Sequence, residues 1–409
     1  MSWIRVLSRG DRVVIGGSVA AIALAGFTRS ANAVLAFACA ALAVGLLAAL
    51  VGRCVDQLGD RFGAGATGVL QSALGNLPEL FISFFALQQG LVAVVQSAII
   101  GSILANLLLV LGAAFLIGGL RNGPQRFDSA RARDICVLLA LATSALVLPS
   151  LAMYTHAPAA KHVRTLSDAV ALVLLAVFAL SLPAALRRGS PDTSSDQARP
   201  AAAPAAAGGD RAPDTVTDRA PDTLTDRAAA AADDPAPGSR PGDAATVERP
   251  SQSHGGVRWP LALAIGLLAA SGVAAAVVSE WFVAALEPAI DALGISQAFA
   301  GLVVVAIAGN AVENVVGIQL AARNQADYAV SVIVNSPLQI ALVLAPALVL
   351  LSLLTTTTLT LVFAPMLVVA VVLAVLVVTL IVVDGESNWL EGVALIGLYV
   401  MIAAVFWWG

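Results

Sequence analysis

Three long stretches of this chain carry almost no charge. Between residues 61 and 121 the one acidic or basic residue is Glu79, and between residues 291 and 323 it is Glu313. Residues 328–383 contain no acidic or basic residue at all. A helix that crosses a bilayer needs about 20 predominantly apolar residues. The first stretch therefore has room for two membrane spans, the second for one and the third for two.

The whole chain fits the same interpretation. Of its 409 residues 59% are apolar and 12% charged, whereas a soluble domain carries about 25% charged residues. The apolar runs are too long for strands and lack their period-2 alternation. We expect an all-α membrane protein with about 11 transmembrane helices, at roughly 12–28, 31–52, 64–88, 91–120, 135–153, 166–187, 258–279, 298–322, 327–352, 358–383 and 389–408.

Basic residues in short loops predict the orientation, because they are retained on the cytoplasmic side. With a cytoplasmic N-terminus, ten arginines fall inside: Arg5, Arg9, Arg12, Arg53, Arg61, Arg121, Arg126, Arg131, Arg133 and Arg323. Only Arg29, Lys161 and Arg164 then fall outside. We expect a multi-pass protein of a prokaryotic-type (inner) cell membrane, with the C-terminus outside and the lipid bilayer as its partner. The net charge of −4 argues against a nucleic-acid partner, and a homo-oligomer is compatible with the sequence.

Residues 189–257 differ from everything around them. They are rich in Ala, Pro, Asp, Arg and Thr, and an eight-residue unit repeats in tandem as DRAPDTVT and DRAPDTLT. Large apolar side chains are scarce, so little burial would offset the entropy of ordering. We expect a disordered cytoplasmic linker that acts as a tether, with a regulatory or ion-sensing role as the alternative.

A short motif occurs once on each side of the linker. It reads GNLPE at 75–79 and GNAVE at 309–313, and in both copies a serine follows 27 residues after the first glycine. The two copies lie five spans apart and therefore run in opposite directions, which predicts inverted repeats of the kind found in secondary transporters. The expected organisation is an extra N-terminal helix (1–30), a five-helix repeat (31–188), the linker (189–257) and a second five-helix repeat (258–409).

The two motif glutamates are the candidate functional residues. A charged carboxylate at the bilayer centre costs about 2.5–3.5 kcal/mol, so Glu79 and Glu313 need a reason to be there. Ca²⁺ takes six to eight oxygen ligands from carboxylates, amides, carbonyls and water. The two carboxylates would supply the charge for such a site. Neutral oxygens could come from Asn76, Asn310, Gln96, Ser102, Asn106, Ser336 and Gln339.

Protons are the second candidate ligand. Two carboxylates close together in a low dielectric cannot both stay ionised without a cation. One Ca²⁺ or two H⁺ would each neutralise the pair, which is the basis of an exchange mechanism. The structural alternative is that both glutamates are protonated and only hold helices together, and some of the neutral residues can equally be packing residues.

At these residues the chain resembles the calcium/proton exchangers of the calcium/cation antiporter superfamily. The resemblance is carried by GNLPE (75–79) with QSAIIGSILAN (96–106) in the first half. In the second half it is carried by EWFV (280–283), FAGL (299–302), GNAVE (309–313), SPLQIA (336–341) and DGESNWLEG (384–392). The chain departs from the family pattern at Pro78, Asn314 and Asn335, and Asn314 replaces the usual histidine.

The resemblance implies eleven spans in two inverted repeats plus an extra helix, and Ca²⁺ transport driven by H⁺ flow. It implies that Glu79 and Glu313 carry the cation and the protons, with Asn76, Asn310, Gln96, Ser102, Ser336 and Gln339 in supporting roles. Ca²⁺ and H⁺ are then cargo, and no cofactor is expected. Na⁺/H⁺ or Na⁺/Ca²⁺ exchange is the runner-up, followed by a passive cation channel. An intramembrane enzyme is disfavoured because no histidine lies in any expected span.

Overall fold

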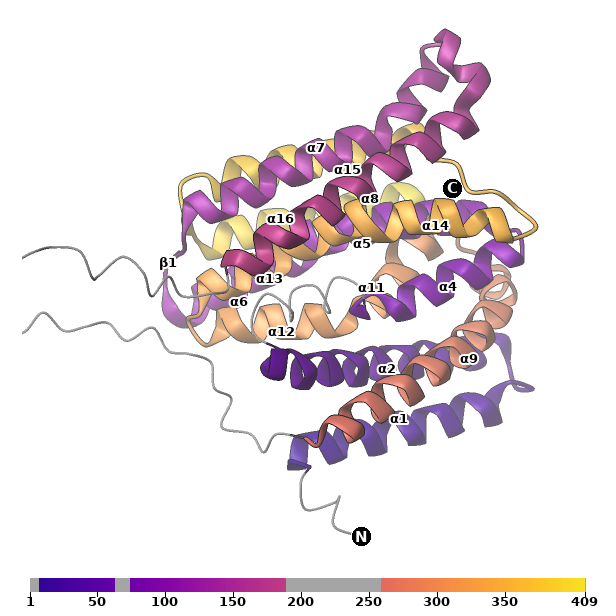
Figure 1. The fold of residues 1–409 in the computed structure, drawn as a ribbon, viewed down its shortest axis with the longest axis vertical. Helices are drawn as coiled ribbons and strands as arrows, with labels where there is room; N and C mark the ends of the chain where they lie inside the picture. The colour runs from indigo at the N-terminus through magenta and orange to yellow at the C-terminus, as the bar shows by residue number, and fades with distance from the viewer. Residues whose placement is uncertain (1–6, 63–73, 189–258, 409) are drawn as a thin grey trace, which may run out of the picture. The chain divides into compact units, whose positions relative to one another are not determined.

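The chain folds into a helical bundle. The computed structural model describes residues 7–62, 74–188 and 259–408, so the expected linker lies outside the described residues. Figure 1 labels most of the helices. In chain order they are α1 (Arg9–Thr28), α2 (Ala33–Phe62), α4 (Leu77–Gln88), α5 (Val92–Leu104), α6 (Leu111–Asn122), α7 (Ser129–Tyr154), α8 (Val163–Arg188), α9 (Leu261–Leu293), α10 (Gln297–Phe299), α11 (Ala306–Gly309), α12 (Ala311–Ala322), α13 (Ala326–Gln339), α14 (Ala345–Leu351), α15 (Pro365–Val382) and α16 (Trp389–Trp407).

Shorter elements complete the bundle. Within the described residues, π-helical segments interrupt α-helices at η2 (Ala105–Val110), η4 (Ala300–Val305) and η5 (Ile340–Leu344). The described 3₁₀ turns are η3 (Pro158–His162) and η6 (Ser352–Leu354). The strands β1 (Gln125–Arg126) and β2 (Glu386–Ser387) form an antiparallel pair between the two halves of the chain.

The predicted membrane architecture is confirmed. Nine helices of the described residues are long and apolar enough to cross a bilayer, and ten if the bent pair 297–309 and 314–322 is one span. The expected span at 64–88 is described only from residue 74 onward, where α4 forms its second half. The count of eleven spans therefore stays a prediction.

Both halves repeat the same order of elements. Asn76 and Asn310 each precede a helix of 12 residues, α4 or α12. The π-helix η2 begins 30 residues after Gly75, and η5 begins 31 residues after Gly309. The repeat inferred from a five-residue motif thus extends to the distortions of the helices themselves.

Helices of the two halves interleave in space. α2 lies against α9, α6 against α12 and α16, and α7 against α15. Figure 1 shows α2 and α9 side by side with α1 next to them. The α2–α9 contact includes Phe37 and Phe282, whose ring centroids are 4.7 Å apart. Each half therefore buries its apolar faces mainly against the other half.

Trp259, the first described residue of the second half, is buried in the bundle. Trp259 is 1% exposed; its backbone N–H donates to Gln57 Oε1 (2.9 Å) and its indole Nε1 donates to Asp11 Oδ2 (3.2 Å). Asp11 also forms an ion pair with Arg53 at 2.7 Å, and Arg61 donates to the Trp259 carbonyl. The start of α1, the end of α2 and the start of α9 are thus joined at one end of the bundle.

Several span boundaries differ by more than a few residues from the sequence expectation. The span expected at 31–52 continues as α2 to Phe62. The span expected at 258–279 continues as α9 to Leu293, because the acidic residues beyond Ser279 do not interrupt the helix. The span expected to start at 358 begins as α15 only at Pro365. Residues 355–364 are instead a non-helical connection between η6 and α15, although Leu359, Leu361 and Phe363 are buried.

Candidate functional site

The two motif copies break their helices in the same way. Asn76 has φ −95° and ψ 17°, and Asn310 has φ −103° and ψ 15°. Both values lie near the sparsely populated bridge region, where active-site residues often occur. Glu79 and Glu313 are then the third residues of α4 and α12. The first turn of a helix carries unsatisfied N–H groups and a partial positive charge, which favours a carboxylate there.

Glu79 lies at the contact between the two halves. Its side chain is 1% exposed, and Ser102 of α5 donates its hydroxyl hydrogen to Glu79 Oε1. On the other carboxylate oxygen, Oε2, Asn310 Nδ2 donates from 3.5 Å. A Cβ built on Gly309 would lie 3.3 Å from Glu79 Cβ. The second motif therefore lies directly against the first glutamate.

Three of the predicted amide residues have a buried side-chain oxygen that accepts no hydrogen bond within the described residues. Asn106 Nδ2 donates to the Ser102 carbonyl at 2.9 Å, and Asn310 Nδ2 donates to the Ala306 carbonyl at 3.0 Å. Their Oδ1 atoms, like Gln339 Oε1, accept no hydrogen bond within the described part of the chain. A buried acceptor without a donor destabilises the folded state. Such oxygens are suitable ligands for a hard cation.

The remaining predicted residues are Ser336, Asn76, Gln96 and Glu313. Ser336 is buried, at 2% exposure. Asn76 is also buried, and its Nδ2 finds no acceptor among the described residues. Gln96 instead donates to the carbonyls of residues 360 and 362, in the connection before α15. For Glu313 only the backbone position in α12 is described.

Two polar residues near the motifs are not among the predicted ligands. Ser83 follows Glu79 by one helical turn, is 1% exposed and has a hydroxyl without a partner in the described residues. Asn314 follows Glu313 directly, and its Oδ1 likewise accepts no bond from the described residues. The four-residue spacing from Glu79, which puts Ser83 on the same face of α4, was the available signal for Ser83.

A glycine-mediated crossing brings the two halves close enough for this contact. A Cβ on Gly101 of α5 would lie 2.3 Å from the Leu302 carbonyl oxygen, and one on Gly301 of η4 would lie 2.3 Å from the Val94 carbonyl oxygen. Such separations exclude any side chain, so α5 and η4 touch backbone to backbone. The crossing is one residue before Ser102, which places that serine at the junction.

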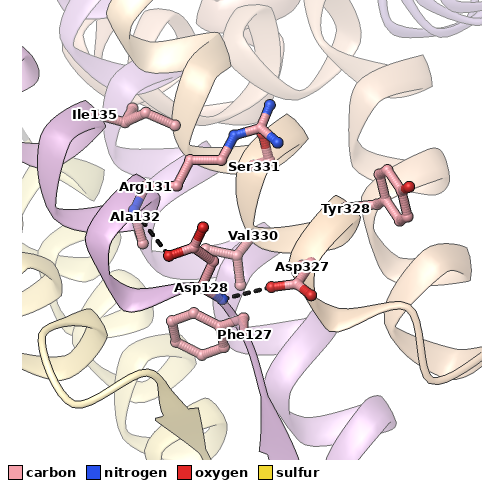
Figure 2. A pocket seen from close by; sticks show the side chains of 9 residues that line it. All are labelled: Phe127, Asp128, Arg131, Ala132, Ile135, Asp327, Tyr328, Val330 and Ser331. Atoms are coloured by element: carbon pink, nitrogen blue, oxygen red, sulfur yellow. Dashed lines mark hydrogen bonds between the residues drawn. The ribbon is translucent and has the colours of Figure 1, made fainter. Parts of the chain in front are cut away.

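A separate pocket opens between the starts of α7 and α13, next to β1. Its volume is about 220 Å³, and Figure 2 shows its lining. The Asp128 backbone N–H donates to Asp327 Oδ1, and the Asp128 carboxylate accepts from the first N–H groups of α7. The nine lining residues include none of those predicted to bind a cation.

Comparison with known proteins fixes the family. The model of the family described as sodium/calcium exchanger protein matches residues 32–186 and 263–408. The chain belongs to this family. The match covers both motif copies and leaves out the residues between the two matched segments, which include the expected linker.

Relatives and solved structures agree with that assignment. A Ca²⁺/H⁺ antiporter of Aphanothece halophytica is 32% identical over 371 residues, which cover 90% of this chain and 89% of the relative. A Ca²⁺/H⁺ antiporter of Synechocystis is 33% identical, covering 90% of each chain. The structure of native YfkE has a TM-score of 0.71 at 28% identity, covering 96% of this chain and 99% of YfkE. The predicted resemblance to calcium/proton exchangers is confirmed.

A more distant structure supports the fold alone. An H⁺/Ca²⁺ exchanger called CAX has a TM-score of 0.63 at 15% identity, covering 96% of this chain and 92% of CAX. The exchanger family is thus identified by the sequence match and the YfkE similarity, and the bundle of Figure 1 is a member of its fold.

Proposed function

We propose that this protein is a secondary transporter, and not an enzyme, that exchanges Ca²⁺ for H⁺ by alternating access. The observation that carries the proposal is the placement of Glu79. This buried carboxylate lies in the first turn of α4, bonded to Ser102 and facing Asn310 of the other half. A carboxylate so placed can hold a proton or contribute to a Ca²⁺ site, and binding one ligand excludes the other.

The cation site in this proposal draws on both halves. Glu79 and Glu313 supply the charge that Ca²⁺ needs, and the buried amide oxygens without donors among the described residues supply neutral ligands. The proposed ligands are Glu79, Glu313, Asn76, Asn310, Ser102, Asn106, Ser336 and Gln339. The names of the two cyanobacterial relatives, both Ca²⁺/H⁺ antiporters, favour Ca²⁺ over Na⁺ as the transported cation.

The proposed orientation places the β1–β2 end in the cytoplasm of a prokaryotic-type cell. Most arginines of the short loops lie in or next to the start of α1, the end of α2 and the strands. Arg29, which follows α1, Lys161 of η3 and Arg164 in the first turn of α8 lie at the opposite end. Retention of basic loops on the cytoplasmic side supports this orientation. The N-terminus and the linker are then cytoplasmic, and the C-terminus is outside.

The test is Ca²⁺ uptake into proteoliposomes that contain the purified full chain. We expect an imposed pH gradient, acid inside, to drive Ca²⁺ accumulation, and we expect a proton-sensitive dye to report H⁺ leaving as Ca²⁺ enters. An outward Na⁺ gradient without a pH gradient is expected to drive none. Uptake that follows the Na⁺ gradient and ignores the pH gradient would make Na⁺/Ca²⁺ exchange the correct function.

A further inference from the structure

The connection between α14 and α15 is irregular yet buried. Leu359, Leu361 and Phe363 are 2%, 0% and 1% exposed, and residues 355–364 form no helix after η6. Buried backbone N–H and C=O groups need partners, and a non-helical segment cannot supply them internally. The groups that form hydrogen bonds with this connection therefore indicate its structural role.

Side chains of α7 and α8 form hydrogen bonds with the second half of the α14–α15 connection. Ser150 of α7 accepts from the Phe363 N–H at 2.9 Å and donates to the Leu361 carbonyl at 3.0 Å. Ser167 of α8 accepts from the Leu361 N–H at 3.0 Å. Tyr154, at the end of α7, donates to the Phe363 carbonyl. These bonds fix alternate residues of the connection to α7 and α8.

The first half of the connection holds the end of α4. Thr357 Oγ1 donates to the Leu87 carbonyl at 2.5 Å, and Thr356 Oγ1 donates to the Gln88 carbonyl at 3.3 Å. Both carbonyls belong to the last turn of α4, and the Leu87 carbonyl also accepts from the Gly90 N–H at 3.1 Å. The connection thus ties the helix that carries Glu79 to the α7–α8 scaffold.

Gln96 forms hydrogen bonds with the middle of the α14–α15 connection. Its Nε2 donates to the Thr360 carbonyl at 3.0 Å and to the Val362 carbonyl at 2.9 Å. Both partners are carbonyl oxygens, which only the NH₂ end of the amide can satisfy. The chemistry of the contact therefore fixes the amide orientation and commits both N–H groups to the connection.

Helix geometry separates Gln96 from the cation site. Gln96 precedes Ser102 by six residues on α5, which puts the two about 9 Å apart along the axis and about 120° apart around it. Ca²⁺ ligands lie within about 2.6 Å of the ion, so neighbouring ligands come from one face. Asn106, one turn after Ser102 and bonded to its carbonyl, meets that condition.

We propose that Gln96 is a positioning residue that holds the α14–α15 connection across the end of α4, and that it does not ligate the transported cation. It acts by donating two hydrogen bonds, and its amide oxygen is dispensable. For its transport readouts this inference rests on the proposed Ca²⁺/H⁺ exchange, whereas the order of the connection is measured without transport.

The first measurement is amide hydrogen exchange of residues 355–364 in the full chain, reconstituted in lipid nanodiscs. We expect Gln96→Leu to speed exchange of these amides and to lower Ca²⁺ turnover, while Ca²⁺ affinity stays unchanged. Loss of a ligand would instead weaken affinity by roughly tenfold and leave the connection protected. Either that result or unchanged protection would overturn the proposal.

Gln96→Glu is expected to act in opposite directions at alkaline pH, depending on whether Gln96 is a ligand or a positioning residue. As a ligand, an added carboxylate strengthens Ca²⁺ binding at alkaline pH, because affinity rises with ligand charge. In a positioning role, the ionised carboxylate of this variant faces two carbonyls with no hydrogen to donate, so protection and turnover fall at alkaline pH. Acid partly restores both, because a protonated carboxyl donates one bond. Stronger Ca²⁺ binding at alkaline pH in this variant would contradict the proposal.

Two control variants complete the design. Ser150→Ala removes an anchor of the same connection from α7 and touches no proposed ligand, so it should reproduce the Gln96→Leu pattern. Combined with Gln96→Leu it should be non-additive. Gln89→Leu alters an exposed glutamine at the same end and should change nothing. If the wild type shows no Ca²⁺/H⁺ exchange, the proposed function fails, while the protection data still decide the role of Gln96.

Discussion

The side-chain amide of Asn310 lies 3.5 Å from a carboxylate oxygen of Glu79, across 231 residues of sequence. The second copy of the asparagine-containing motif thus faces the glutamate of the first. Because Ser102 bonds the other oxygen of the same carboxylate, Glu79 connects α4, α5 and the start of α12. Changes to any of these groups should affect transport.

Neutralising either motif glutamate should abolish exchange. We expect Glu79→Gln and Glu313→Gln to reduce Ca²⁺ uptake to the level of empty liposomes, because each removes half of the charge that offsets the cation. Folding should persist, since a neutral amide is cheaper to bury than a carboxylate. Glu386→Gln, at an exposed ion pair with Arg126, is the matched control and should transport normally. Wild-type uptake by either motif variant would disprove the assignment.

The Ser102 hydroxyl should matter through its carboxylate partner. We expect Ser102→Ala to weaken Ca²⁺ affinity by roughly ten- to hundredfold, since hydrogen bonds to charged groups contribute about 1.5–3 kcal/mol. Isothermal titration of the purified protein measures the effect. Ser144→Ala is the control, because the Ser144 hydroxyl is exposed and bonds the Ala140 carbonyl of its own helix. Equal affinities for the two variants would remove Ser102 from the site.

Calcium and protons should compete. If both bind the glutamates, apparent Ca²⁺ affinity falls as the pH falls, because cation binding requires deprotonated ligands. Titration in buffers of different ionisation enthalpy should count protons released per Ca²⁺, between one and two depending on how many glutamates start protonated. An affinity that does not change with pH, without proton release, would rule out proton exchange at this site.

The α5–η4 crossing should tolerate no side chain. We expect Gly101→Ala to destabilise the protein by about 1–3 kcal/mol through overpacking, because the added Cβ would meet the Leu302 carbonyl at 2.3 Å. Thermal unfolding in detergent should therefore show a lower Tm. Gly266→Ala is the matched control, since among the described residues its added Cβ meets no atom within 4 Å beyond its own stretch of α9. An unchanged Tm for Gly101→Ala would mean that the crossing is looser than described.

The linker should be dispensable so long as its anchor remains. We expect deletion of residues 190–256, joined by a short flexible segment, to leave exchange intact, because Trp259 keeps its bonds to Asp11 and Gln57. Adding Trp259→Ala should lower the thermal stability of the deleted chain. Altered Ca²⁺ affinity in the deletion alone, without unfolding, would reveal a regulatory linker.

Much of this architecture could be predicted from the sequence. Long uncharged runs define spans because backbone in lipid must be helical, and the parity of the spans makes the repeats inverted. The repeated motif puts Glu79, Ser102 and Asn310 in one set of candidate residues, and the structure adds the contacts between them. These features depend on patterns that are local or periodic, and such patterns are visible without a structure.

The α14–α15 connection could not be predicted in the same way. Residues 358–364 are each apolar or β-branched, and hydropathy alone does not distinguish a buried extended segment from the start of a helix. What decides the outcome is a set of hydrogen bonds from Ser150, Ser167 and Gln96, which come from distant parts of the chain. For the same reason Gln96 was grouped with the ligands, although its partners lie in this connection.

The separation of Glu79 from Asn310 also has a consequence for biosynthesis. At 5–20 residues per second, the ribosome adds Asn310 roughly 10–50 s after Glu79. Glu79 therefore enters the bilayer well before the second half of its site exists. Ser102, only 23 residues later, is the partner available during that interval. The nascent first half thus has a donor for its buried carboxylate while the second half is still being translated.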